Sequence, residues 1–254
     1  MLAWKGVLRP SHLDFIIMDP STASSPAASS NYSKAKPLSS LLEMCDMELN
    51  NQIKDNAKWK KRSEDTTLNV HFPELDNPCS KACNILLIGS SMLERFKTTG
   101  HDLNLGLKPH IFNAGVGGDT IPNVLYRMNL GLLQKAKYQA KVGTVVVNIG
   151  SNDLKKPGRS LSEVQLYQFA LHLEALRRTF PRIVVTALFY KKDVQLSDVD
   201  RSNEDLQKIV SGFPGVEWLA APQMDLIHHY EDHVHLNRDG YEVWDKWLVE
   251  KLGI

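Results

Sequence analysis

From about residue 78 onward, short apolar runs alternate with longer amphipathic segments, and this alternation limits the possible folds most strongly. The apolar runs cover residues 84–89, 110–114, 144–149, 183–189 and 216–220. They are rich in β-branched residues and nearly continuous, as expected of strands that are covered on both faces. We therefore expect an α/β protein, a three-layer α/β/α sandwich around a five-stranded parallel sheet. The ligand crevice of such a sheet lies at the carboxyl ends of its strands.

The segments between these runs predict the helices. Ser160 and Glu163 have the spacing of a capping box, and the segment that follows carries one apolar stripe at helical spacing. The last helix is expected to follow Gly240, with Trp244 and Leu248 on its inner side. Strands and helices thus alternate to the end of the chain.

The first 77 residues are organised differently. Residues 19 to about 37 are rich in Ser, Ala and Pro, with little apolar content, and we expect a disordered tail over residues 1–37. Ser40 and Glu43 predict the start of an amphipathic helix, within a helical extension and linker over residues 38–77. That extension either docks on the main domain, residues 78–254, or binds a partner.

A basic run, Lys58-Trp59-Lys60-Lys61-Arg62, follows this predicted helix. It has the composition of a nuclear signal or nucleic-acid patch, but a solvated helix end, favoured by the C-terminal dipole, is the more common role. The whole chain has 30 basic and 29 acidic residues, a net charge of +1. This balance gives no reason to expect a nucleic-acid partner, and neutral substrates fit it best.

The cysteines indicate a reducing compartment. Cys45, Cys79 and Cys83 are odd in number and lack the Cys-x-x-Cys spacing of redox or zinc motifs, so free thiols are expected. The apolar patch at residues 13–18 is too short for a signal-peptide core or a membrane span. We expect a cytoplasmic protein without stable membrane insertion, and Met18 offers an alternative start.

Two polar segments follow the first two predicted strands, where a doubly wound sheet collects its functional groups. Gly89-Ser90-Ser91-Met92 can project a serine hydroxyl into the crevice, although Gly-Ser-Ser is also an ordinary turn. The glycine-rich segment 113–120 opens a helix and suits an oxyanion or a nucleotide phosphate. It lacks the third glycine of the dinucleotide motif, and no Walker lysine follows it.

Two further segments complete the set. Asn152, after the third strand, can donate its amide to an oxyanion, although an Asx turn is the simpler explanation for this residue alone. Asp232 and His235 lie three residues apart before the last helix. The carboxylate can therefore hold one imidazole nitrogen while the other faces the serine.

Together, the four segments resemble the Ser-Gly-Asn-His hydrolases, also called GDSL-type esterases, over about residues 84–250. The resemblance implies a flavodoxin-like fold and a Ser-His-Asp catalytic triad of Ser91, His235 and Asp232. It also implies an oxyanion hole formed by Ser91, Gly118 and Asn152. The catalytic subunits of the intracellular platelet-activating-factor acetylhydrolases look most similar, with the same Asn-x-Gly-x-Gly-Gly-Asp-Thr and Asp-x-x-His-Leu patterns. Ser90 stands where the family usually has aspartate, and its hydroxyl is an alternative nucleophile in the same turn.

The expected function is a cofactor-independent serine esterase that acts on a small-molecule carboxylic ester, with a short acyl group preferred from the resemblance. A homodimer is possible. Two alternatives stay open: a scaffold that has kept the fold and lost turnover, and a metal-dependent hydrolase that uses the histidine-rich run 228–235. An α/β-hydrolase-fold lipase is less favoured because the chain has no Gly-x-Ser-x-Gly elbow.

Overall fold

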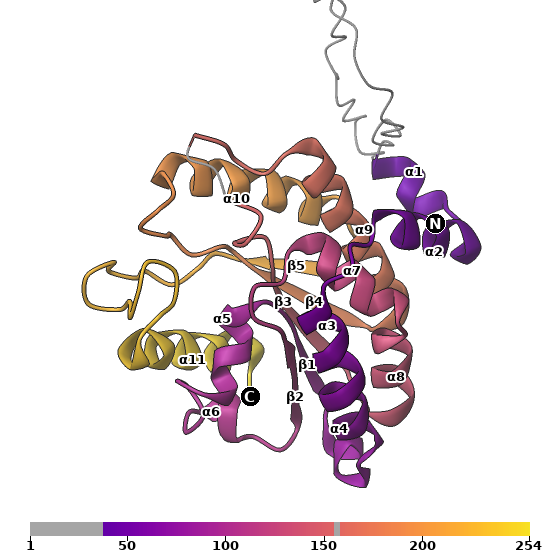
Figure 1. Ribbon diagram of the computed structural model, residues 1–254, viewed down its shortest axis with the longest axis horizontal. Coiled ribbons are helices and arrows are strands. Elements are labelled where there is room, and N and C mark those ends of the chain that lie inside the picture. Colours follow the sequence, from indigo (N-terminus) through magenta and orange to yellow (C-terminus); the bar gives the residue numbers. More distant parts are fainter. Residues whose placement is uncertain (1–37, 155–157) are drawn as a thin grey trace, which may run out of the picture.

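The computed structural model describes residues 38–154 and 158–254, and the predicted tail over residues 1–37 lies outside them (Figure 1). Five parallel strands form one sheet in the order β2-β1-β3-β4-β5. The strands are β1 (Ile85–Gly89), β2 (Ile111–Gly115), β3 (Thr144–Asn148), β4 (Arg182–Thr186) and β5 (Val216–Leu219). The predicted five-stranded parallel sheet is confirmed, with strand ends that differ from the predicted ones by at most three residues.

Side chains from successive strand residues enter two separate cores, because neighbouring residues of a strand point to opposite faces. Leu86 and Ile88 of β1 belong to one core, and Ile85 and Leu87 belong to the other. Both faces of β1 are therefore buried, which explains why its sequence is apolar without alternation.

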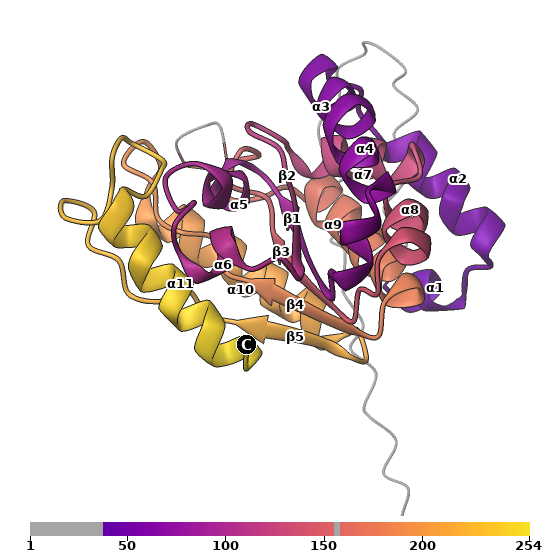
Figure 2. The same cartoon turned by 90° about the horizontal axis from the view of Figure 1, so that it is seen from below.

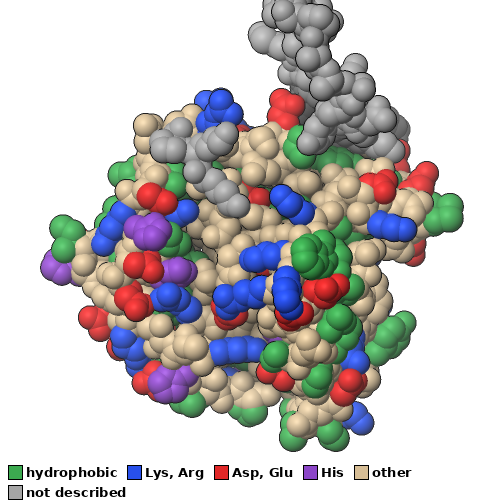
Figure 3. Space-filling model, viewed as in Figure 1, with side chains coloured by type: hydrophobic (Ala, Val, Ile, Leu, Met, Phe, Trp, Pro, Cys, Tyr) green, Lys and Arg blue, Asp and Glu red, His purple; other side chains and the backbone are tan. Residues whose placement is uncertain are grey.

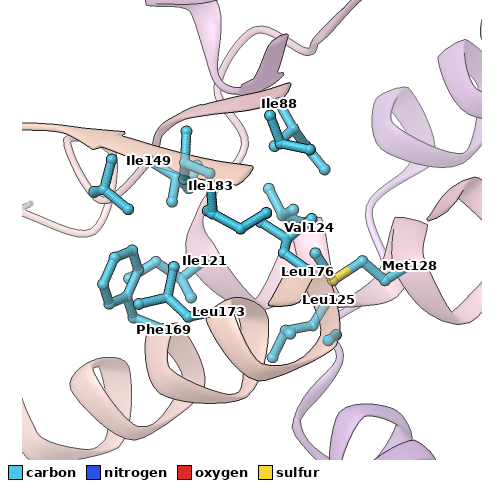
Figure 4. Packing of buried hydrophobic residues seen from close by; sticks show 14 of the residues in the cluster. Ile88, Ile121, Val124, Leu125, Met128, Ile149, Phe169, Leu173, Leu176 and Ile183 are labelled. Atoms are coloured by element: carbon cyan, nitrogen blue, oxygen red, sulfur yellow. The ribbon is translucent and has the colours of Figure 1, made fainter. Parts of the chain in front are cut away.

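Helices cover the two faces as separate layers (Figure 2). The first layer contains α7 (Ile121–Asn129), α8 (Leu132–Gln139), α9 (Glu163–Thr179) and α10 (Leu196–Ser211). The second contains α5 (Ser91–Glu94), α6 (Asn104–Leu107) and α11 (Arg238–Leu252). Figure 4 shows the first core, where Phe169 and Leu173 of α9 and Val124 of α7 pack against strand residues such as Ile183. The three-layer architecture is as predicted.

Two predicted helix starts are wrong. Helix α9 begins at Glu163 with Ser162 as its N-cap, and Ser162 forms the capping box with Gln165, so the box lies two residues beyond the predicted Ser160. Helix α11 begins at Arg238, capped by the side chain of Asn237, rather than after Gly240. In both cases a nearby residue with an equally suitable capping side chain is used instead.

The extension over residues 38–77 docks on the first helix layer, which is the first of the two alternatives for it. Its helices are α1 (Leu38–Glu43), α2 (Asp46–Asn56), α3 (Lys61–Thr66) and α4 (Phe72–Asp76), with a π-helical turn at Thr67–His71 between the last two. Helix α2 packs against α7 and α9, and α4 packs against α8. The predicted capping box at Ser40 is wrong, because Ser40 lies inside α1 and the box forms at Cys45 and Glu48 instead.

The basic run is also placed differently from the prediction. Helix α2 ends at Asn56, and α3 begins at Lys61 with Lys60 as its N-cap, so the run joins two helices instead of closing one. Residues 57–60 are extended or irregular and pass beside the first turn of α7, where Lys58 N–H donates to the Pro122 carbonyl oxygen at 2.9 Å. A C-terminal dipole therefore does not account for these basic residues.

The cysteines and the lengths of the helices bear on two further expectations from the sequence. The three cysteines are unpaired, with Cys45 and Cys79 exposed and Cys83 buried. No helix in the described part of the chain combines the length and the apolar character that a membrane crossing requires. The cellular compartment stays a prediction.

Candidate active site

The sheet register brings three of the predicted segments to one edge. Gly89 at the end of β1 pairs with Gly115 of β2 on one side and with Asn148 of β3 on the other. A side chain at Gly89 would collide with the Asn148 carbonyl oxygen, so the close approach of β1 and β3 requires glycine. The segments that follow these strands therefore start side by side, at the point where the strand order reverses.

Ser91 is the serine whose hydroxyl lies next to an imidazole. It is the first residue of α5, and its Oγ lies 2.9 Å from Nε2 of His235. Its amide lies in the first turn of that helix, where N–H groups have no intrahelical acceptor. Ser90 is the N-cap residue and is fully buried, and its Oγ has no hydrogen-bond partner among the described residues. The geometry favours Ser91 over Ser90.

The loop before α11 holds the imidazole from its other side. Oδ2 of Asp232 lies 2.7 Å from Nδ1 of His235, and Oδ1 accepts the backbone amides of Val234 and His235, both at 2.7 Å. Partial burial alone would raise the pKa of Asp232, but these hydrogen bonds outweigh it and hold the pKa well below its usual value. The carboxylate thus stays ionised and oriented toward the imidazole.

Residues from other elements fix the turn that carries Ser91. The hydroxyl of Tyr241, on α11, donates to the Met92 carbonyl oxygen at 2.8 Å. The Asn113 side chain donates to the Leu93 carbonyl oxygen at 2.7 Å and accepts the Gly115 amide at 2.9 Å, which ties β2 to α5. The turn that carries Ser91 is therefore anchored from α11 and from β2, although Ser90 stands where the resembled family usually has aspartate.

The glycine-rich segment follows β2 and ends at the N-terminus of α7. Gly118 has φ of +74°, the left-handed region in which a side chain is strained. Thr120 is the N-cap of α7 and forms a capping box with Asn123. The Asn152 side chain donates to the Asp119 carbonyl oxygen at 2.9 Å, so the second and third predicted segments are directly linked.

A fully buried ion pair lies beneath this segment and was not predicted. Arg127 Nε is 2.8 Å from Asp119 Oδ2, and the same guanidinium donates to the carbonyl oxygens of Ala114 at 2.7 Å and Gly89 at 3.2 Å. Arg127 therefore connects the ends of β1 and β2 to the glycine-rich segment. The available signal was its position among the apolar residues of α7, where an unpaired charge would be very costly.

Charged side chains surround the turn that carries Ser91. Arg62 of α3 donates to both carboxylate oxygens of Glu94, at 2.9 and 3.0 Å, and Arg95 pairs with Glu231 at 2.7 Å. These ion pairs connect Glu94, the last residue of α5, to the N-terminal extension, and Arg95, the next residue, to the loop before α11. Figure 3 shows the basic side chains grouped near the middle of this face and histidines gathered beside them.

The histidine-rich run does not form a metal-ligand cluster in the structure. Within residues 38–154 and 158–254, no three His, Cys, Asp or Glu side chains converge as metal ligands. His229 Nδ1 accepts the Asp225 amide at 2.9 Å, and His235 contacts Ser91 and Asp232. These two histidines of the run therefore make contacts within the loop and with Ser91.

Comparison with solved structures identifies proteins of similar fold. A provisionally assigned platelet activating factor from Streptococcus pneumoniae matches with a TM-score of 0.60 and 20% identity, over 81% of this chain and 97% of its own. A provisionally assigned acylhydrolase from Bacteroides fragilis matches with a TM-score of 0.54 and 15% identity, over 77% and 98%. A member of the lipolytic G-D-S-L family from Veillonella parvula matches with a TM-score of 0.51 and 15% identity, over 65% and 96%.

These likenesses show a shared fold. No protein-family model and no curated protein matches the sequence. The chain therefore has the three-layer α/β/α fold of GDSL-type esterases and acylhydrolases, in agreement with the resemblance of its four motifs. The roles of individual residues depend on the geometry described above.

Proposed function

We propose that this chain is a serine esterase that hydrolyses carboxylic esters. The proposal rests mainly on one observation, the hydrogen-bonded chain from Ser91 Oγ to His235 to Asp232 at the carboxyl edge of the sheet. The two distances, 2.9 and 2.7 Å, are those of a nucleophile next to its base and a base next to its orienting carboxylate. The fold shared with esterases and acylhydrolases supports the same reaction class.

In the proposed acylation step, Ser91 Oγ attacks the ester carbonyl carbon while His235 Nε2 accepts the hydroxyl proton. The ionised Asp232 stabilises the imidazolium that forms and holds its tautomer. The tetrahedral intermediate then collapses with cleavage of the bond to the alcohol oxygen, which takes the proton from His235. The products of this step are the free alcohol and an acyl ester on Ser91.

The negative oxygen of the tetrahedral intermediate requires hydrogen-bond donors placed in advance. We assign this role to the amides of Ser91 and Gly118 and to the side chain of Asn152. The two backbone amides belong to neighbouring segments at one sheet edge, and Asn152 reaches the same glycine-rich segment through its bond to Asp119. The free enzyme therefore holds Asn152 against this loop before any substrate binds.

Deacylation repeats the same chemistry with water in place of the serine. His235 removes a proton from a water molecule as the water oxygen attacks the acyl carbon. The bond between the acyl carbon and Ser91 Oγ then breaks, the proton passes from His235 to Ser91 Oγ, and the acid leaves. No metal or organic cofactor is needed for either step. Among esters, we propose those with short acyl groups, an assignment that rests on the motif resemblance to the acetylhydrolase subunits.

The direct test is hydrolysis of p-nitrophenyl acetate, butyrate and octanoate by the wild type and by Ser91→Ala and Ser90→Ala variants, with and without a chelator. We expect chelator-resistant activity that is lost in Ser91→Ala and kept in Ser90→Ala, with acetate or butyrate preferred. Loss of activity with the chelator would instead support the metal-dependent alternative. A folded wild type with no activity on any ester would support the scaffold alternative.

A further inference from the structure

We infer that Lys60 and Ser63, in the N-terminal extension, are positioning residues for the oxyanion side of the active site. The inference rests on the proposed function, because it assigns these residues to the loop that carries Gly118. Both residues lie some 55 positions before that loop in the sequence and outside the segment that resembles the esterase family. The geometry brings them to the loop through the docking of α3.

Ser63 makes the more buried of the two contacts. Its side chain is fully buried, and its Oγ donates to Asp119 Oδ1 at 2.6 Å. Asp119 Oδ2 is occupied by Arg127, so the two oxygens of one buried carboxylate connect the extension to the core of the domain. A buried carboxylate of this kind needs all of its hydrogen-bond donors, and one of them comes from the extension.

Lys60 reaches the same loop from its solvent side. Its Nζ donates to the Gly117 carbonyl oxygen at 3.1 Å and lies 3.5 Å from Asp119 Oδ1. The same nitrogen lies 3.0 Å from the place that a Cβ on Gly118 would take, so the ammonium group lies beside the proposed oxyanion donor. Because the contact is made to a backbone oxygen of the loop, Lys60 restrains the chain on which the Gly118 amide is carried.

Backbone contacts keep this corner of the extension in place. Lys58 N–H donates to the Pro122 carbonyl oxygen at 2.9 Å, and the Asn123 side chain donates to the Lys58 carbonyl oxygen at 2.8 Å. The extension is therefore attached to the first turn of α7, directly after the loop. Because the backbone is already held here, Lys60 and Ser63 lose little conformational freedom when their side chains contact Asp119.

Asp119 transmits this restraint to two of the three proposed oxyanion donors. Its carbonyl oxygen holds the Asn152 side chain, and it is the next residue after Gly118. A displacement of Asp119 would therefore move both donors relative to Ser91. Misplacement of catalytic groups by about 1 Å can lower a rate by roughly 10²-fold.

The test compares the kinetics of Lys60→Met, Ser63→Ala and the double variant with those of a matched control, Lys61→Met. Lys61 is adjacent in sequence, but its side chain is 76% exposed and pairs with Asp65 on the surface of α3. We expect kcat on p-nitrophenyl acetate to fall by roughly 10-fold in each single variant and by roughly 10²-fold in the double variant, with KM little changed. The Lys61→Met control should match the wild type.

Two further readouts separate positioning from a merely structural role. A boronic-acid inhibitor forms a tetrahedral adduct on a serine. Its affinity should fall by the same factor as kcat, while KM for the ester stays unchanged. Lys60→Arg should recover most of the rate lost in Lys60→Met, because it keeps a cationic donor at the loop. If the double variant does not fold, the single variants decide the question.

Unchanged kcat in Lys60→Met and Ser63→Ala, in a wild type that is active and depends on Ser91, would overturn the inference and leave the proposed function intact. The inference would also be overturned if kcat fell only in proportion to the folded fraction of the variant. In that case the folded molecules would bind the inhibitor with unchanged affinity. An inactive wild type would instead count against the proposed function itself.

Discussion

We predict that two buried histidines make the stability of this protein sensitive to mild acid. His71 and His172 are fully buried, and no ring nitrogen of either has a hydrogen-bond partner among the described residues. Burial, with a smaller contribution from the charge of Arg127, lowers the pKa of His71 to about 2 and that of His172 to about 3, from an ordinary value of 6.5. Both rings are therefore neutral in the folded protein at any pH near neutrality.

The sign of the effect follows from proton binding. Below pH 6.5 an unfolded chain binds a proton at each histidine and the folded chain does not, so the free energy of unfolding falls as the pH falls. Between pH 7 and pH 5 the loss is about 2 kcal/mol for each histidine and about 4 kcal/mol for both. This is a large fraction of the roughly 5–15 kcal/mol that stabilises a typical domain.

The assay is urea unfolding at pH 7 and pH 5, followed by tryptophan fluorescence, for the wild type and for His172→Leu and His71→Leu. Each variant should lose about 2 kcal/mol less than the wild type over this interval, because it lacks one of the protonation sites. His101→Gln, at an exposed histidine, is the control for the removal of a histidine from outside the core. If the two leucine variants showed the full wild-type loss, the reasoning about the buried rings would be refuted.

Three further predictions concern the active site. Asn152→Ala should lower kcat by roughly 10²–10³-fold with little change in the unfolding midpoint, because it removes a donor used mainly in the transition state. An unchanged kcat would exclude Asn152 from the oxyanion hole. Asp232→Asn should lower kcat by about 10⁴-fold, since an amide does not hold the productive imidazole tautomer; a kcat within tenfold of the wild type would argue against that role. Gly118→Ala should cost about 1 kcal/mol of stability because φ is +74°, and should also lower kcat; equal stability in urea unfolding would contradict the strain argument.

The sheet and the four motif segments could be predicted because their signals are local. Each strand is a short β-branched run buried on both faces, and the parallel order places the segments after β1, β2 and β3 at one edge. The contact between Ser91 and His235 joins residues 144 positions apart, yet it follows from that topology together with the family resemblance. The helix starts were less predictable, since several neighbouring residues can cap a helix.

The supporting contacts of the site could not be predicted, because they depend on which helices dock beside each other. The basic run at residues 58–62 has the composition of a solvated helix end, and nothing within it indicates that Lys60 lies beside Gly118. The partner of Arg127 was equally hidden, because the glycine-rich pattern of segment 113–120 does not indicate that the carboxylate of Asp119 is buried. Such pairings arise from tertiary packing rather than from local sequence preference.

The central claim, that Ser91 is the nucleophile, is tested most directly by covalent labelling with a fluorophosphonate and mass spectrometry of the peptide that contains residues 90 and 91. Attack by the serine oxygen displaces fluoride and leaves a phosphonate ester on the attacking residue. We predict one adduct per chain, on Ser91, which is retained in Ser90→Ala and absent in Ser91→Ala. Labelling that persists in a folded Ser91→Ala variant, or an adduct on Ser90 in the wild type, would contradict the claim.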